Sequence, residues 1–177
     1  MKHLFEIVLF VVVVVAMVAT MSSCNTAGCL DNRSSLPLAD IYSSTTNRPI
    51  MADSIEIGGV DAPGDSILAN YNEHLSKVYL PLRSDRSMTA FYFEYKWKGM
   101  TPADNDTLKI YYTSYPYFAS EECGAMYRYR ITRIEHTSIV LDSVAVLDSL
   151  VTNVERSIMR LYFPTAEESR SRVLQMR

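Results

Sequence analysis

The strongest constraint on the fold is a strict alternation of side chains over residues 88–97. Aromatic residues occupy every second position from 91 to 97, with Tyr92, Glu94 and Lys96 between them. Because successive side chains of a β-strand point to opposite faces of its sheet, this spacing is typical of a strand with one buried side. The aromatic residues on that side are Phe91, Phe93, Tyr95 and Trp97. Turn residues fill 99–106 and a second alternating run begins at Leu108, so we expect a β-hairpin.

Shorter runs of the same kind predict an all-β fold. Residues 139–151 place apolar residues at helical spacing, but Val, Ile and Ser dominate them; we predict two short strands, with a helix as the alternative. The other expected strands are 55–57, 78–82, 108–112, 127–131 and 157–163. This pattern favours an antiparallel β-sandwich, immunoglobulin-like in kind, or a partly open barrel.

The N-terminus has the pattern of a secretory signal peptide. Lys2 precedes thirteen uninterrupted apolar residues, Ile7–Ala19, whereas a membrane-spanning helix needs about 20. Met21-Ser22-Ser23-Cys24 then resembles the lipobox of bacterial lipoproteins, in which the cysteine is acylated and becomes the first mature residue. We expect residues 1–23 to be removed and Cys24 to attach the chain to a membrane through its lipid. An ordinary secretory signal or an uncleaved anchor is the alternative.

The cysteine count agrees with a lipid on Cys24. The chain contains only Cys24, Cys29 and Cys123, and an odd number in a secreted protein needs an explanation. If Cys24 is acylated, Cys29 and Cys123 remain in a compartment where a disulfide can persist, and we predict that they pair. A bond between Cys24 and Cys29 becomes available only if lipidation fails.

The mature chain divides into three predicted parts. Residues 24–53 are rich in Ser, Thr, Asn and Asp and are expected to form the lipidated N-terminus and a linker. Residues 54–163 form the β-domain. Residues 164–177 are a frayed tail, with a capping-box pattern at Thr165–Glu168 that favours a short helix. Removing residues 1–23 takes away Lys2 and Glu6, so the net charge stays −3, which argues against a nucleic-acid partner.

One motif is similar to an enzyme signature but lacks its partners. Gly64-Asp65-Ser66 resembles the nucleophile block of the SGNH or GDSL esterases, which need a histidine in an Asp-x-x-His block. Arg133 stands at that aspartate position before His136, and Tyr71 stands there before His74. An esterase is therefore not expected. The alternative to a non-enzyme is a periplasmic enzyme with dispersed residues, namely His74, His136, Asp61 and Asp65.

No metal or other cofactor is expected. The oxygen-rich run Asp104-Asn105-Asp106 lacks the glycine and distal glutamate of an EF-hand loop, so it predicts a turn in preference to a calcium site. The two mature histidines give no zinc-binding spacing.

An aromatic run at 111–118 is the most suggestive candidate surface. Tyrosines offer a large contact area at little entropic cost, so Tyr111, Tyr115 and Tyr117 are candidates for binding a protein or a glycan. The competing interpretation is that half of the run faces the core and the rest covers a sheet edge.

Four features together resemble an uncharacterised lipoprotein family of Bacteroidales-type bacteria. They are the lipobox cysteine, Cys29, the strand entry Asp53-Ser54-Ile55, and Ser120-Glu121-Glu122-Cys123-Gly124. The resemblance implies a Gram-negative envelope and the same pairing of Cys29 with Cys123, and it brings no activity. Residues 25–28 carry no charge, which favours a periplasm-facing position, expected on the outer membrane. We therefore expect a non-catalytic envelope lipoprotein whose β-domain binds an envelope protein or a glycan, or serves an envelope assembly.

Overall fold

The computed structural model describes residues 35–64, 66–97, 100–120, 124–165 and 168. The predicted signal peptide and the three cysteines lie outside these residues, as does most of the C-terminal tail. Within the described part, no helix has the length and apolar character needed to cross a membrane.

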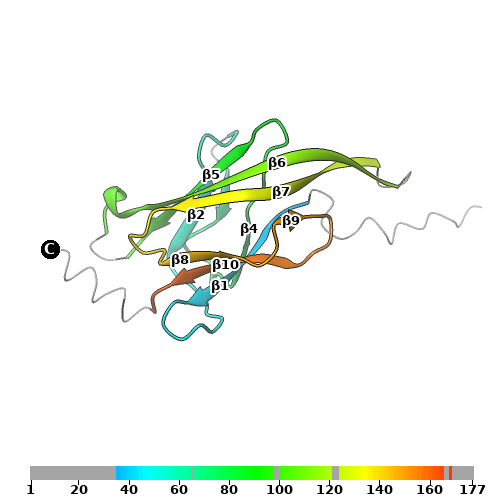
Figure 1. The fold of residues 1–177 in the computed structure, drawn as a ribbon. Coiled ribbons are helices and arrows are strands. Elements are labelled where there is room, and N and C mark those ends of the chain that lie inside the picture. Colours follow the sequence, from blue (N-terminus) through cyan, green and yellow to red (C-terminus); the bar gives the residue numbers. More distant parts are fainter. Residues whose placement is uncertain (1–34, 65, 98–99, 121–123, 166–167, 169–177) are drawn as a thin grey trace, which may run out of the picture. The chain divides into compact units, whose positions relative to one another are not determined.

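Two β-sheets pack face to face and do not close into a barrel, so the predicted all-β class is confirmed and the sandwich is the architecture observed (Figure 1). The four-stranded sheet has the order β4 (Lys77–Tyr79), β1 (Leu38–Ser43), β10 (Ser157–Phe163), β8 (Ser143–Val146). The six-stranded sheet has the order β3 (Ile67–Ala69), β2 (Ile55–Gly59), β5 (Met88–Tyr95), β6 (Asp106–Ser120), β7 (Gly124–His136), β9 (Leu150–Val151). All neighbours are antiparallel except β1 and β10, which run parallel.

The strand with the clearest alternation behaves as expected. Phe91, Phe93 and Tyr95 of β5 are buried between the sheets, while the intervening side chains are half-buried. β5 and β6 pair as an antiparallel hairpin with Phe91 opposite Leu108, and the turn between them contains the short 3-10 helix η2 (Pro102–Asp104). Phe93 packs against Phe163 of β10, with ring centroids 6.2 Å apart, so the aromatic side of β5 joins the two sheets.

The assignment of all of residues 24–53 to a linker is wrong, because β1 lies within that range. β1 occupies the interior of the four-stranded sheet, antiparallel to β4 and parallel to β10. Its side chains Leu38, Ala39 and Ile41 are buried in the shared core. Strand β3 was not predicted either. The compact unit therefore begins well before residue 54.

The ambiguous segment after residue 138 forms strands, as predicted. β8 pairs with β10 in one sheet, and β9 pairs with β7 in the other, so the chain crosses between the sheets here. Val140 and Leu141 enter the core in the crossing from β7 to β8. The β-branched residues of this segment thus pack in extended backbone.

Strands β6 and β7 continue far beyond the rest of their sheet. Pairing of β5 with β6 ends at Met88 and Tyr111, and β9 pairs only with Tyr129 and Arg130 of β7. Residues 113–120 and 124–128 therefore form a two-stranded projection, which we call the arm and which extends from one end of the sandwich (Figure 1). Pro116 is compatible with β6 because this part of the strand has a neighbour on one side only.

Candidate functional site

The three candidate tyrosines lie along β6, at the base of the arm and within it. Tyr111 stands opposite Arg133, Tyr115 opposite Arg128, and Tyr117 opposite Met126. The register shifts between Tyr111 and Tyr112, which is a β-bulge at the point where the arm leaves the sheet. All three tyrosines are half-buried, so the surface predicted from the sequence is only partly open to solvent.

Tyr111 is held by an ion pair on β7. Its Oη donates a hydrogen bond to Glu135 Oε2 at 2.8 Å, and this bond raises the pKa of Tyr111 above its ordinary value. The Arg133 guanidinium lies 4.0 Å from the centre of the Tyr111 ring, and Arg133 Nη1 is 2.6 Å from Glu135 Oε1. A cation over an aromatic face is attracted by the ring quadrupole. Tyr111 is therefore a positioned member of a cluster on the outer side of the sheet.

Tyr117, further along the arm, also has a guanidinium group over its ring. The guanidinium carbon of Arg128 lies 3.2 Å from the centre of the Tyr117 ring. Arg128 Nη2 also donates to Asn153 Oδ1 at 3.4 Å, which links the arm to the β9–β10 turn. The cross-strand Tyr–Arg pairs present aromatic surface and guanidinium groups together, a combination that suits carboxylates, planar rings and sugar faces.

The most exposed aromatic side chains of the arm are different from the predicted ones. Phe118 is 64% exposed and Tyr127 is 45% exposed. Phe118 belongs to the aromatic run at 111–118, whereas the pattern around Tyr127 predicts only a strand. Strand alternation alone does not identify these two residues. They are exposed because they lie beyond Tyr111 and Tyr129, where β5 and β9 stop pairing with β6 and β7.

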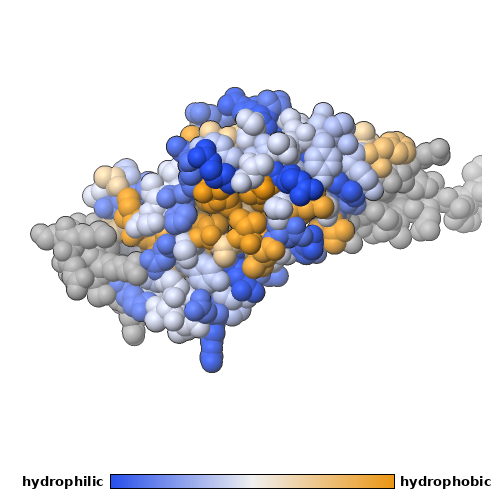
Figure 2. Space-filling view, viewed as in Figure 1, coloured by the Kyte–Doolittle hydropathy of each residue, from blue (hydrophilic) through white to orange (hydrophobic). Residues whose placement is uncertain are grey.

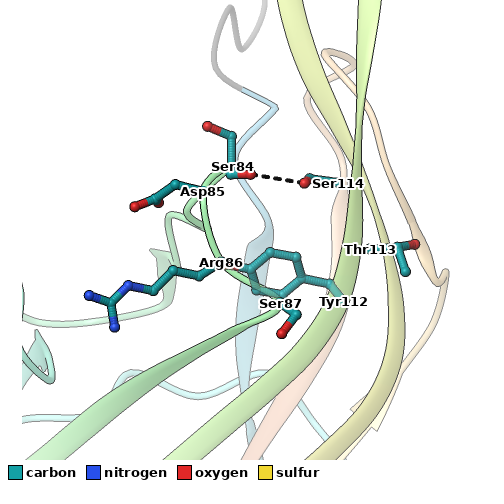
Figure 3. A pocket seen from close by; sticks show the side chains of 7 residues that line it. All are labelled: Ser84, Asp85, Arg86, Ser87, Tyr112, Thr113 and Ser114. Carbon is teal, nitrogen blue, oxygen red and sulfur yellow. Dashed lines mark hydrogen bonds between the residues drawn. The ribbon is translucent and has the colours of Figure 1, made fainter.

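A shallow polar depression lies beside the base of the arm (Figure 3). Its volume is about 490 Å³, and it is lined by Ser84, Asp85, Arg86, Ser87, Tyr112, Thr113 and Ser114. Ser114 Oγ donates to Ser84 O at 3.0 Å, which holds the β4–β5 loop against β6. The Arg83 guanidinium hydrogen bonds with Asp85 and lowers the pKa of that carboxyl. The depression is thus lined by hydroxyl groups, the guanidinium group of Arg86 and one carboxylate that is already paired.

Tyr112 lines this depression, and its hydroxyl group already forms hydrogen bonds with other protein groups. Tyr112 Oη accepts from Arg83 N at 2.9 Å and donates to Arg83 O at 2.8 Å. Thr89 Oγ1 lies 2.7 Å from the same oxygen. Tyr112 therefore anchors the loop.

The residues of the enzyme alternative are not brought together where they are described. His74 Nδ1 pairs with Asp53, and both side chains are exposed. His136 Nδ1 lies 2.8 Å from the backbone oxygen of Thr137, at the end of β7. Asp61 lies in the turn after β2 with a positive φ of 55°, and Asp65 lies outside the described residues. The His74–Asp53 pair was not found from the sequence, because the two residues come from separate loops.

Asp106, for which the sequence predicts only a turn, organises the contacts between the start of β6 and the segment after β7. It is fully buried, and its carboxylate accepts five hydrogen bonds. The donors are Tyr95 Oη at 2.8 Å, Thr137 Oγ1 at 2.6 Å, and the backbone N–H groups of Ile139, Val140 and Leu141 at 2.9, 2.7 and 2.8 Å. Burial, followed by the charge of Asp106 and the hydrogen bond to it, holds the pKa of Tyr95 well above its ordinary value. These contacts use both carboxylate oxygens.

The described residues contain no group of three His, Cys, Asp or Glu side chains that could hold a metal ion. Cys24, Cys29 and Cys123 lie outside the described part, so lipidation and the Cys29–Cys123 disulfide stay predictions. Two described residues that are near these cysteines in the sequence contact each other: Ser35 Oγ lies 4.0 Å from Met126 Sδ. Ser35 is six positions after Cys29, and Met126 is three positions after Cys123.

The first residues of the tail show one of the contacts of a capping box, and the short helix stays a prediction. Glu168 Oε2 accepts from the backbone N–H of Thr165 and from its Oγ1, both at 3.0 Å. Thr45 Oγ1 also donates to Glu168, which connects the start of the tail to the turn after β1.

A family model described as a family of unknown function (DUF6452) matches residues 54–163. No curated protein and no solved structure is significantly similar to the chain.

Proposed function

Because the chain belongs to the DUF6452 family, whose function is unknown, the family supplies no activity, and we propose that the protein is a membrane-anchored envelope lipoprotein with a non-catalytic binding domain. The anchor is a lipid on Cys24, and the domain faces the periplasm from the outer membrane. The finer proposal is that the family consists of lipoproteins of Bacteroidales-type bacteria. The lipobox pattern at Met21–Cys24 supports the anchor.

The arm is the observation that carries the binding proposal. A two-stranded projection has little hydrophobic core of its own, so packing of the sandwich does not explain the tyrosine and arginine side chains of the arm. Tyr115, Tyr117 and Arg128 lie on one side of it, with Tyr111 and Arg133 continuing the same side at its base. Tyr and Arg are enriched in the central residues of protein interfaces. This surface is therefore the proposed contact for an envelope protein or a glycan.

Replacing the lipidated cysteine tests the anchor. In Cys24→Ser, we expect loss of fatty-acid labelling and loss of retention in the membrane fraction, because serine offers no thiol for acylation. The measurement is metabolic labelling with a palmitate analogue, followed by fractionation. Cys29→Ser is the matched control and should keep both. Normal processing and membrane retention of Cys24→Ser would remove the basis of the proposal.

Substitutions on the arm test the binding surface. In Tyr115→Ser/Tyr117→Ser, we expect the affinity for the envelope ligand to fall at least tenfold, because contact residues of this type contribute about 1–2 kcal/mol or more each. The measurement is quantitative capture from solubilised envelopes, together with a glycan array. The control is Tyr71→Ser, which removes an exposed tyrosine outside the arm. Equal capture by the arm variant and the parent would contradict the assignment of the surface.

A further inference from the structure

Exposed apolar side chains lie at the end of the molecule that bears the arm. Phe118 on β6 is 64% exposed, Tyr127 on β7 is 45% exposed, and Val154 in the β9–β10 turn is 59% exposed. Arg128 bridges to Asn153, so this turn lies beside the arm. Figure 2 shows a small apolar group at the end of the arm, separate from the larger apolar area between the two sheets. We call Phe118, Tyr127 and Val154 the apolar tip.

The chain that comes from the proposed lipid enters the domain at this same end. Ser35 is fully buried, and its hydroxyl contacts Met126 of the arm. Ser35 is eleven positions after Cys24 in the chain. Whatever their conformation, eleven residue steps span at most about 40 Å. A lipid on Cys24 therefore holds Ser35, and with it the arm end of the domain, within about 40 Å of the membrane surface.

The charge of this end indicates what kind of contact is possible. From the first to the last residue of the arm, 113–128, the charged side chains are Glu121, Glu122 and Arg128, so the net charge is −1. Attraction to anionic headgroups would need an excess of Lys or Arg. Tyrosine, by contrast, is enriched at the membrane–water interface, and phenylalanine is common on the buried face of interfacial membrane helices.

We propose that the apolar tip is a membrane-contact surface that inserts into the interfacial region of the bilayer holding the Cys24 lipid. The inference rests on the proposed lipid anchor and adds a second, non-covalent contact. Tethering makes this contact effectively intramolecular, so a weak individual affinity is sufficient for occupancy. With the arm end against the bilayer, the opposite end, where β5 ends and η2 lies, faces away from the membrane (Figure 1).

A tryptophan reporter tests the depth of the tip directly. The chain has a single tryptophan, Trp97, which follows the end of β5 remote from the arm. The reporter is Phe118→Trp in the lipidated full-length mature protein, bound to neutral phosphatidylcholine–phosphatidylethanolamine vesicles that contain brominated acyl chains. We expect the additional emission to shift to shorter wavelength and most of it to be quenched by the bromines.

Two controls define the background. Met51→Trp places a reporter at a position of similar exposure, 69%, in the loop between β1 and β2 outside the arm, and it should show neither effect. The parent protein reports on Trp97 alone. Equal emission of Phe118→Trp with brominated and ordinary lipids would overturn the proposal. So would a spectral shift that appears only after an envelope protein is added, since that would make the tip a protein-binding surface.

Failure of the lipid anchor can be distinguished from failure of the membrane contact. The mature chain, carrying Cys24→Ser and an N-terminal hexahistidine tag, is held on nickel-chelating lipid in the same vesicles. Quenching of Phe118→Trp there supports the contact even if Cys24 is not acylated in cells. Quenching should also be insensitive to salt and to added anionic lipid; a requirement for anionic lipid would overturn the proposed aromatic insertion.

Discussion

Asp106→Ala is expected to lower the free energy of unfolding by about 3–5 kcal/mol, the range for removing one partner of a buried charged network. Asp106 is fully buried and accepts five hydrogen bonds, three of them from consecutive backbone N–H groups at 139–141. Alanine would leave these buried donors without an acceptor, and each unsatisfied buried group costs about 1–3 kcal/mol. The loss is a large share of the 5–15 kcal/mol or so that typically stabilises a domain. The measurement is urea unfolding, with a lower midpoint and an unchanged denaturant slope.

Two further substitutions show whether the hydrogen bonds carry this effect. Asp106→Asn keeps the shape but places an amide donor against existing donors, so it should be nearly as destabilising as alanine. Tyr95→Phe removes only the bond from Tyr95 Oη and should cost about 1.5–3 kcal/mol, the usual value for a bond to a charged group. Asp85→Ala removes an exposed aspartate and is the control with little expected change. Full stability of Asp106→Asn would refute the network explanation.

Removal of β1 is expected to abolish cooperative folding. A fragment of residues 54–163, the extent of the family match, lacks the strand that joins β4 to β10. It loses the buried side chains Leu38 and Ile41, worth about 1.5–3 kcal/mol each, and leaves backbone groups of β4 and β10 unpaired. The sum is comparable with the whole stability of a domain. Circular dichroism and thermal unfolding would detect the loss.

A longer fragment and a point substitution provide the comparison. Residues 35–177 keep β1 and should unfold cooperatively, and a peptide of residues 35–47 added to the short fragment should restore part of its structure by pairing between β4 and β10. Ile41→Ala in the full chain should cost about 2–5 kcal/mol, because Ile41 is fully buried. A fragment of residues 54–163 that unfolds at the same temperature as residues 35–177 would show that β1 is dispensable.

The sequence identified the elements whose signal is local. The alternation through Phe91, Phe93 and Tyr95 predicted β5, and the turn residues that follow predicted the hairpin with β6. The same alternation does not reveal β1, because its six residues gain their role from β10, more than 100 positions away in the chain. A short interior strand is stabilised by neighbours on both sides, and its own residues need show little pattern.

The residue types of the run at 111–118 indicated a candidate surface, but the pairing register of β6 with β7 decides how exposed its tyrosines are. Tyr111 and Tyr117 were expected to be exposed, but Arg133 and Arg128 on β7 cover their rings. Which β7 side chain meets which tyrosine depends on the bulge between Tyr111 and Tyr112, and a shift of one residue would place different groups opposite each other. Asp106 was assigned to a turn for the same reason, since its donors at 139–141 are over 30 residues away.

The sequence by itself determined the all-β class, most of the strands, and the leader and cysteine pattern from which the lipid anchor is proposed, because these follow from periodicity and composition along the chain. Only the tertiary structure decided that the strands form two sheets, that β1 belongs to the core, that Asp106 organises the β7–β8 crossing, and that β6 and β7 extend as an arm. These features depend on pairing between segments that are distant in the chain. The free energy of such pairing is set by both segments, so neither segment's own sequence reveals it. The position of Phe118 and Tyr127 beside the chain entry at Ser35 is of this kind, and the proposed membrane contact follows from it.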